Sequence, residues 1–138
     1  MRSTLIVLML LFPALAVVNT WWFARELKRF LKATPALAST ADVERMKKVV
    51  ARQMYAALVQ ILLLAVSPVV FAVGLLRHVL HPGDVLFIVL PSAAVIVLSL
   101  AFKRIEAAAR SLDTPDDELR RQRDAIVHTW LKKPFPDW

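Results

Sequence analysis

Residues 53–76 read QMYAALVQILLLAVSPVVFAVGLL and contain no Asp, Glu, Lys, Arg or His. Two more stretches share this property, Ser3–Ala24 and Val85–Phe102. In chain order the three stretches are 22, 24 and 18 residues long, and a hydrocarbon core roughly 30 Å thick needs about 20 mostly apolar residues per helix. The sequence therefore predicts an all-α integral membrane protein with three transmembrane helices.

We expect a single membrane domain over residues 1–138, because what lies outside the apolar stretches is too short for a separate water-soluble core. The membrane-spanning helices are predicted at about residues 4–23, 54–76 and 85–102. The predicted order is a first transmembrane segment (3–23), a basic cytoplasmic loop (24–53), a second transmembrane segment (54–76), an outer turn (77–84), a third transmembrane segment (85–102) and cytoplasmic helices with a tail (103–138).

Lys and Arg are distributed unevenly between these segments. Of the 18, one precedes the first apolar stretch, eight lie between the first and second, one lies between the second and third, and eight follow the third. Short basic loops remain in the cytoplasm. We therefore predict a multi-pass protein of the bacterial inner (cytoplasmic) membrane, with the N-terminus outside and the C-terminus in the cytoplasm. Aromatic residues at the cytoplasmic ends agree with this orientation: Trp21, Trp22, Tyr55 and Phe102.

A secretory signal peptide is the alternative interpretation of the first stretch. Arg2 would form its charged region, Leu5–Val18 its apolar region, and Ala14-Leu15-Ala16 its cleavage site. Cleavage would leave the eight basic residues of the following loop outside the cell, against the charge rule. We therefore favour an uncleaved membrane anchor.

Each apolar stretch is expected to continue as helix into the cytoplasm. The first continues to about Lys32. The second helix begins near Ala41, after a capping-box pattern formed by Ser39 and Asp42, and the third extends through residues 103–112. These extensions would form the cytoplasmic part of the protein.

An amphipathic C-terminal helix is predicted at about residues 115–131, with Thr114 as its N-cap and Pro115 at its first position. Its apolar face must be buried on the membrane surface, on the other cytoplasmic extensions or on a partner. The tail that follows contains two prolines and is expected to be extended. The residues predicted to contact a partner are Leu119, Ile126, Trp130, Phe135 and Trp138.

Polar and small side chains within the apolar stretches indicate where helices pack. Gln60 is expected to form a hydrogen bond across helices, although a pore-lining role is the alternative. Small residues let membrane helices approach closely, and they recur on one stripe of the second and third stretches. The predicted helix-packing residues are therefore Gln60, Ala57, Ala65, Ala72, Ser92 and Ser99.

Each apolar stretch also contains one proline, Pro13, Pro68 or Pro91. Membrane helices tolerate proline where a neighbouring helix or a hydroxyl satisfies the freed carbonyl. Ser67 and Ser92 adjoin two of the prolines and could supply such hydroxyls. The prolines could act as hinges or as static bends, and we favour static bends.

Metal and cofactor binding have little support. His78, His81 and Asp84 are the one combination with metal-like spacing, but they lie in a predicted solvent-exposed turn without a fourth ligand. We therefore interpret them as a polar cap and predict no bound metal and no cofactor. The absence of cysteine excludes thiolate ligands and disulfides.

The basic loop is expected to attract anionic lipid headgroups, since each Lys or Arg near such a surface contributes about 1 kcal/mol. The predicted headgroup-binding residues are Arg25, Lys28, Arg29, Lys47 and Lys48. No recognition module for nucleic acid accompanies this charge, so nucleic-acid binding is not predicted.

No glycine-rich phosphate loop and no intramembrane acid or histidine is present, so the sequence does not predict an enzyme, a pump or a proton relay. Our leading hypothesis is an accessory, assembly or scaffolding subunit of a larger membrane complex, with other membrane subunits as partners. The alternative is a self-assembling pore, because the three-span plan with a basic cytoplasmic tail is similar in layout to three-span phage holins. A homo-oligomer is compatible with both. A small transporter or redox subunit is a third, weaker hypothesis.

Overall fold

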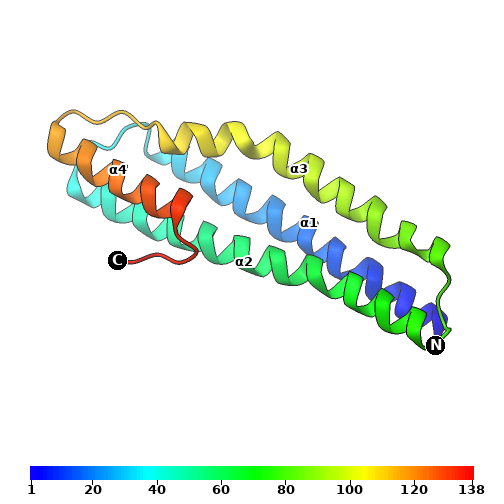
Figure 1. The fold of residues 1–138 in the computed structure, drawn as a ribbon. Helices are drawn as coiled ribbons and strands as arrows, with labels where there is room; N and C mark the ends of the chain where they lie inside the picture. The colour runs from blue at the N-terminus through cyan, green and yellow to red at the C-terminus, as the bar shows by residue number, and fades with distance from the viewer. The chain divides into compact units, whose positions relative to one another are not determined.

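The computed structural model describes residues 1–138 and contains helices only (Figure 1). Three helices are long and apolar enough to span a membrane, and the third of these includes the short 3-10 turn that precedes it. The predicted extensions beyond the apolar stretches are confirmed, since each long helix continues past its own stretch. The elements are α1 (Arg2–Ala33), α2 (Thr40–Leu76), the 3-10 turn η1 (Pro82–Val85), α3 (Leu86–Arg110) and α4 (Asp117–Lys132).

The chain forms two compact units, each assembled from parts of several helices. Unit 1 consists of Met1–Trp21 and Val59–Ala101, and unit 2 consists of Trp22–Leu58 and Phe102–Trp138. Unit 1 therefore contains most of the apolar sequence, whereas unit 2 contains most of the charged residues.

In unit 1, hydrogen bonds between α1 and α2 show that the two helices run antiparallel. The Ser67 hydroxyl donates to the Met9 carbonyl at 3.0 Å, and the Asn19 amide donates to the Gln60 side-chain oxygen at 2.9 Å. Residue numbers rise along α1 as they fall along α2, as an antiparallel pair requires. These two polar contacts thus join α1 and α2 inside the unit.

The Ser67 hydroxyl compensates for a backbone hydrogen bond that Pro13 removes from α1. Proline has no backbone N–H, so Pro13 leaves the carbonyl four residues earlier, that of Met9, without its helical partner. Ser67 supplies the missing donor from the neighbouring helix, and its side chain is fully buried. Sequence analysis had paired Ser67 with the adjacent Pro68. That pairing is wrong, because the hydroxyl bonds across helices.

The outer surface of unit 1 is apolar on all three helices. In water, contiguous apolar patches of this kind drive association, whereas hydrocarbon covers them at no cost. Arg2–Trp21, at 1.5 Å per residue, is about 30 Å long, which matches the thickness of a hydrocarbon core. The exposed apolar side chains include Val7, Leu11, Val18, Ile61, Leu62, Val69, Leu90, Ile96 and Val97.

The link between α2 and α3 closes one end of unit 1. The Gly74 carbonyl accepts hydrogen bonds from the backbone N–H groups of Val79 and Leu80 at 2.9 and 3.1 Å, which ends α2. Leu80 then packs directly over Gly74, so that a Cβ at position 74 would lie 2.6 Å from the Leu80 Cγ. Any side chain at position 74 would therefore force Leu80 to move. The reversal uses a left-handed residue at His78, with φ of 55°, and Pro82 and Gly83 begin η1.

Unit 2 has an apolar core of the kind found in water-soluble bundles. Leu119 and Ile126 of α4 are only 6% and 2% exposed, and they pack in one cluster with residues of α1, α2 and α3. In Figure 1, α4 runs alongside the first part of α2. The core residues are Leu27, Phe30, Leu37, Val43, Met46, Val50, Met54, Ala109, Leu112, Leu119 and Ile126.

The position of α4 corrects two expectations. Leu119 and Ile126 were predicted to contact a partner, but they fill the core of the chain itself, and Trp130 packs partly buried against the same cluster. Their periodicity required burial and could not specify the covering surface. Asp116, not Thr114, caps α4, because its carboxylate accepts from the Leu119 N–H at 2.8 Å.

We predict that Ser67→Ala destabilises the protein by about 1–2 kcal/mol, because it leaves the Met9 carbonyl buried without a donor. Adding Pro13→Ala should recover most of this loss, since it restores an N–H to α1 four residues after Met9. Denaturant titration in mixed micelles, followed by circular dichroism, measures both effects. Additive losses in the double variant would show that the two residues are not coupled through this carbonyl.

Candidate functional site

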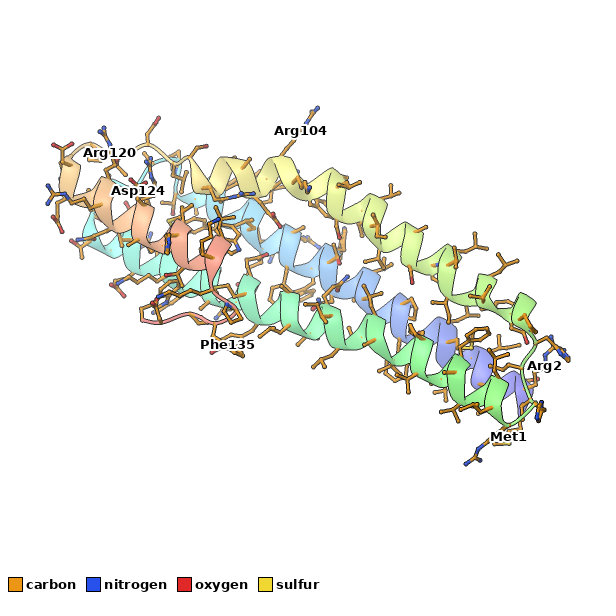
Figure 2. All side chains as sticks on the ribbon, in the orientation of Figure 1. Met1, Arg2, Arg104, Arg120, Asp124 and Phe135 are labelled. Atoms are coloured by element: carbon orange, nitrogen blue, oxygen red, sulfur yellow. The ribbon has the colours of Figure 1, made fainter.

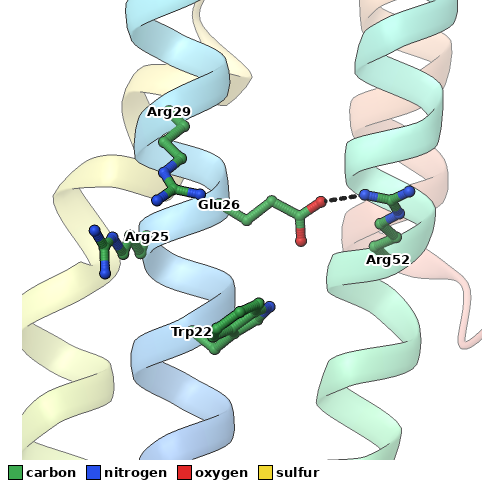
Figure 3. Close-up of a pocket in the computed structure, with 5 residues that line it drawn as sticks. All are labelled: Trp22, Arg25, Glu26, Arg29 and Arg52. Carbon is green, nitrogen blue, oxygen red and sulfur yellow. Dashed lines mark hydrogen bonds and ion pairs between the residues drawn. The ribbon is translucent and has the colours of Figure 1, made fainter.

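A basic pocket in unit 2 is the candidate functional site. It has a volume of about 260 Å³ and is lined by five residues. Four of them lie on α1 at spacings of three and four residues, which places them on one face of the helix. The fifth comes from α2, across the pocket (Figure 3). The lining residues are Trp22, Arg25, Glu26, Arg29 and Arg52.

An ion pair across the pocket joins its two helices. The Glu26 carboxylate reaches from α1 and accepts from the Arg52 guanidinium on α2 at 2.6 Å (Figure 3). The side chain of Glu26 is 22% exposed, whereas that of Arg52 is 67% exposed. Glu26 therefore fixes one face of the Arg52 guanidinium and leaves its other N–H groups accessible.

The charges of the pocket do not balance. Three guanidinium groups surround one carboxylate, so the formal charge of the lining residues is +2. Arg29 forms no ion pair in the structure, and Trp22 is 60% exposed at the edge of the pocket. The site thus combines accessible cationic donors with an exposed aromatic surface.

The pocket includes some of the predicted headgroup-binding residues and not others. Arg25 and Arg29 line it. Lys28 and Lys48 are exposed and lie outside it, and Lys47 pairs with Glu44 at 3.2 Å. Total charge in the loop therefore did not locate the site.

Three lining residues, Trp22, Glu26 and Arg52, were not among the residues predicted from the sequence to form a site. A signal was present in the sequence. Arg25 is the first charged residue after the first apolar stretch, and Arg52 is the last before the second. In two adjacent antiparallel helices such residues lie at the same level.

The predicted helix-packing residues have mixed positions. Gln60 bonds to Asn19, as described above, and its amide nitrogen is buried without a partner. Ser92 is partly buried, and Ser99 is exposed. The alanine stripe is exposed and does not form the packing face within the chain, because that face of α2 contains Ser67 and Gly74. The stripe consists of Ala57, Ala65 and Ala72.

The predicted His/Asp cluster in the outer turn has a different role. The buried Asp84 carboxylate accepts from the Arg2 guanidinium and from the His81 backbone N–H, both at 2.9 Å. His78 and His81 are exposed, and no three His, Cys, Asp or Glu side chains lie close enough to hold a metal ion. Asp84 thus ties the start of α1 to the link before α3, near the labelled Arg2 in Figure 2.

The C-terminal tail is held at its end. The Asp137 carboxylate accepts from Lys133 and from the Thr129 hydroxyl of α4. These donors, Lys133 first, lower the pKa of Asp137 from its ordinary value. Phe135 and Trp138 flank this anchor and remain 55% and 43% exposed. The tail therefore presents two aromatic side chains at fixed positions.

Guanidinium groups bind phosphate and carboxylate groups through paired, charge-assisted hydrogen bonds. The pocket offers such donors from two helices, whereas the tail offers apolar area. No known protein family, curated protein or solved structure matches the chain.

We predict that Asn19→Leu destabilises unit 1, because Gln60 then loses its partner inside an apolar environment. The expected cost is about 1 kcal/mol. The double variant Asn19→Leu/Gln60→Leu should be closer to the original protein, since it removes both polar groups. Denaturant titration in mixed micelles measures the coupling. A double variant at least as unstable as the sum of the two single ones would contradict a packing role for this pair.

Proposed function

We propose that the protein is a non-catalytic, multi-pass protein of the bacterial inner membrane that serves as an accessory, assembly or scaffolding subunit of a larger membrane complex. The observation that carries this proposal is the pair of exposed aromatic residues in the anchored tail, Phe135 and Trp138. Aromatic side chains are enriched at protein interfaces and often dominate their binding energy. An extended tail that holds two of them outward suits contact with another subunit.

The charge distribution supports an orientation with unit 2 in the cytoplasm. Sixteen of the 18 Lys and Arg residues lie in the basic loop or after the third apolar stretch. Of the other two, Arg2 is neutralised by Asp84 at 2.9 Å. Arg77 is the other cation at that end, so the asymmetry in Lys and Arg between the two ends is sixteen to two.

A self-assembling pore, similar in layout to a holin, is the alternative, and the geometry favours it less. A pore needs polar side chains directed towards its lumen. Here Gln60 bonds to Asn19, and Ser67 bonds to the Met9 carbonyl, so both are used inside a single chain. The exposed faces of the same helices are apolar.

The tagged full-length protein, purified from its native membrane in mild detergent, tests the proposal. We predict that native mass spectrometry shows a stoichiometric complex with other membrane subunits. Truncation before Lys132, or the double variant Phe135→Ser/Trp138→Ser, should reduce retention of these subunits at least about tenfold, as expected for loss of interface aromatics. Insertion into the membrane should be unchanged.

Leu131→Ser is the matched control, because Leu131 is an exposed apolar residue of α4 outside the tail. It should retain the same subunits as the original chain. A complex that is unaffected by the tail variants would contradict the role of the tail. Recovery of a homo-oligomer without foreign subunits would contradict the accessory function and favour the pore.

A further inference from the structure

The basic pocket has chemistry that the proposed accessory function does not use. Its lining carries a formal charge of +2 from three arginines and one glutamate. A lining with this net positive charge favours a bound anion, because each guanidinium attracts a nearby negative charge. Its volume of about 260 Å³ admits a small anionic group and not a folded partner.

The place of the pocket in the sequence indicates its surroundings. Trp22 lies within the last residues of the first apolar stretch, and Arg25 follows that stretch directly. Arg52 directly precedes the second apolar stretch. If the apolar stretches lie in hydrocarbon, the pocket lies at the depth of the lipid phosphates, and a half-exposed tryptophan is typical of that depth.

We propose that Arg29 and Arg52 form a binding site for a single phosphate group, as carried by the headgroup of an anionic phospholipid, with Arg25 adding positive charge to the same pocket. This goes beyond general attraction of basic residues to a charged surface, because it assigns one ligand to one pocket. Basic pockets between helices at the membrane boundary bind phospholipid headgroups in this way. Guanidinium groups from two helices can engage several oxygens of one phosphate at once.

Glu26 has a positioning role in this site. Its carboxylate would repel a phosphate, but it is directed to Arg52 at 2.6 Å (Figure 3). The ion pair holds the Arg52 guanidinium across the pocket from Arg29 and partly neutralises the carboxylate. The phosphate then binds on the side of Arg29 and takes the remaining N–H groups of Arg52. The exposed face of Trp22 is available to the glycerol or upper acyl region of a lipid.

Arg29→Gln is the decisive variant. Arg29 is exposed and forms no ion pair, so its replacement removes a phosphate donor without breaking a contact of the fold. Arg104→Gln is the matched control, since it removes the same charge from an exposed arginine of unit 2 that points away from the helices in Figure 2. Circular dichroism confirms that both variants fold.

Native mass spectrometry of the full chain in neutral detergent measures retained lipid, with phosphatidylglycerol and phosphatidylcholine of identical acyl chains as probes. We expect one phosphatidylglycerol retained in preference to phosphatidylcholine, about tenfold less retention in Arg29→Gln, and no change in Arg104→Gln. Equal losses in the two variants would overturn the site in favour of general charge attraction. Absence of any preference for phosphatidylglycerol would overturn the lipid as its ligand.

A second experiment distinguishes a phospholipid from a soluble phosphate compound as the ligand. Glycerol 3-phosphate is added to the lipid-bound protein, with chloride at the same ionic strength as the control. Retention of the lipid supports a phospholipid as the ligand. Displacement by glycerol 3-phosphate but not by chloride supports the phosphate site and assigns it to a soluble phosphate. Retention of foreign subunits by Arg29→Gln is measured in parallel, so that failure of the pocket and failure of the accessory function are separate results.

Discussion

Pro13 interrupts α1 within a stretch that has no charged residue, and it frees the Met9 carbonyl from its helical partner. In hydrocarbon no water can replace that partner, so an unsatisfied carbonyl is destabilising. The Ser67 hydroxyl meets it at 3.0 Å. This requirement fixes the register of α1 against α2, because only one alignment brings Ser67 to Met9. The bond between Asn19 and Gln60 forms in the same alignment. A single missing N–H thus favours this alignment of α1 with α2.

The two units have opposite distributions of polar and apolar side chains, although both contain parts of the same three long helices. Unit 1 buries the contacts of Ser67, Asn19 and Gln60 between helices and exposes many apolar side chains, a pattern suited to hydrocarbon. Unit 2 buries an apolar cluster and exposes its charged residues, as water demands. α4 belongs to unit 2, because its apolar face completes the core of that unit. What remains for recognition is the surface of unit 1, the basic pocket and the aromatic tail.

The helices could be predicted from the sequence because three stretches without charge, together with local caps, leave few alternative secondary structures. The contacts between the helices could not be predicted in the same way. Ala57, Ala65 and Ala72 were predicted to form the packing face of α2 because small residues let helices approach closely. In the structure, Ser67 and Gly74 lie on that face. The periodicity of α4 required a cover for Leu119 and Ile126 without identifying it as the chain itself. Charge indicated Arg25 and Arg29, but only the pairing of α1 with α2 adds Glu26 and Arg52 to the same pocket.

The central claim is that unit 1 lies in the membrane with the α2–α3 link outside and unit 2 in the cytoplasm. The chain has no cysteine, so single cysteines can report on each region through a membrane-impermeant maleimide applied to spheroplasts. The account predicts that Gly83→Cys reacts in intact spheroplasts, that Arg121→Cys reacts only after lysis, and that Val97→Cys, exposed on α3, reacts in neither state. Equal reaction of Gly83→Cys and Arg121→Cys in intact spheroplasts, or rapid reaction of Val97→Cys, would contradict it.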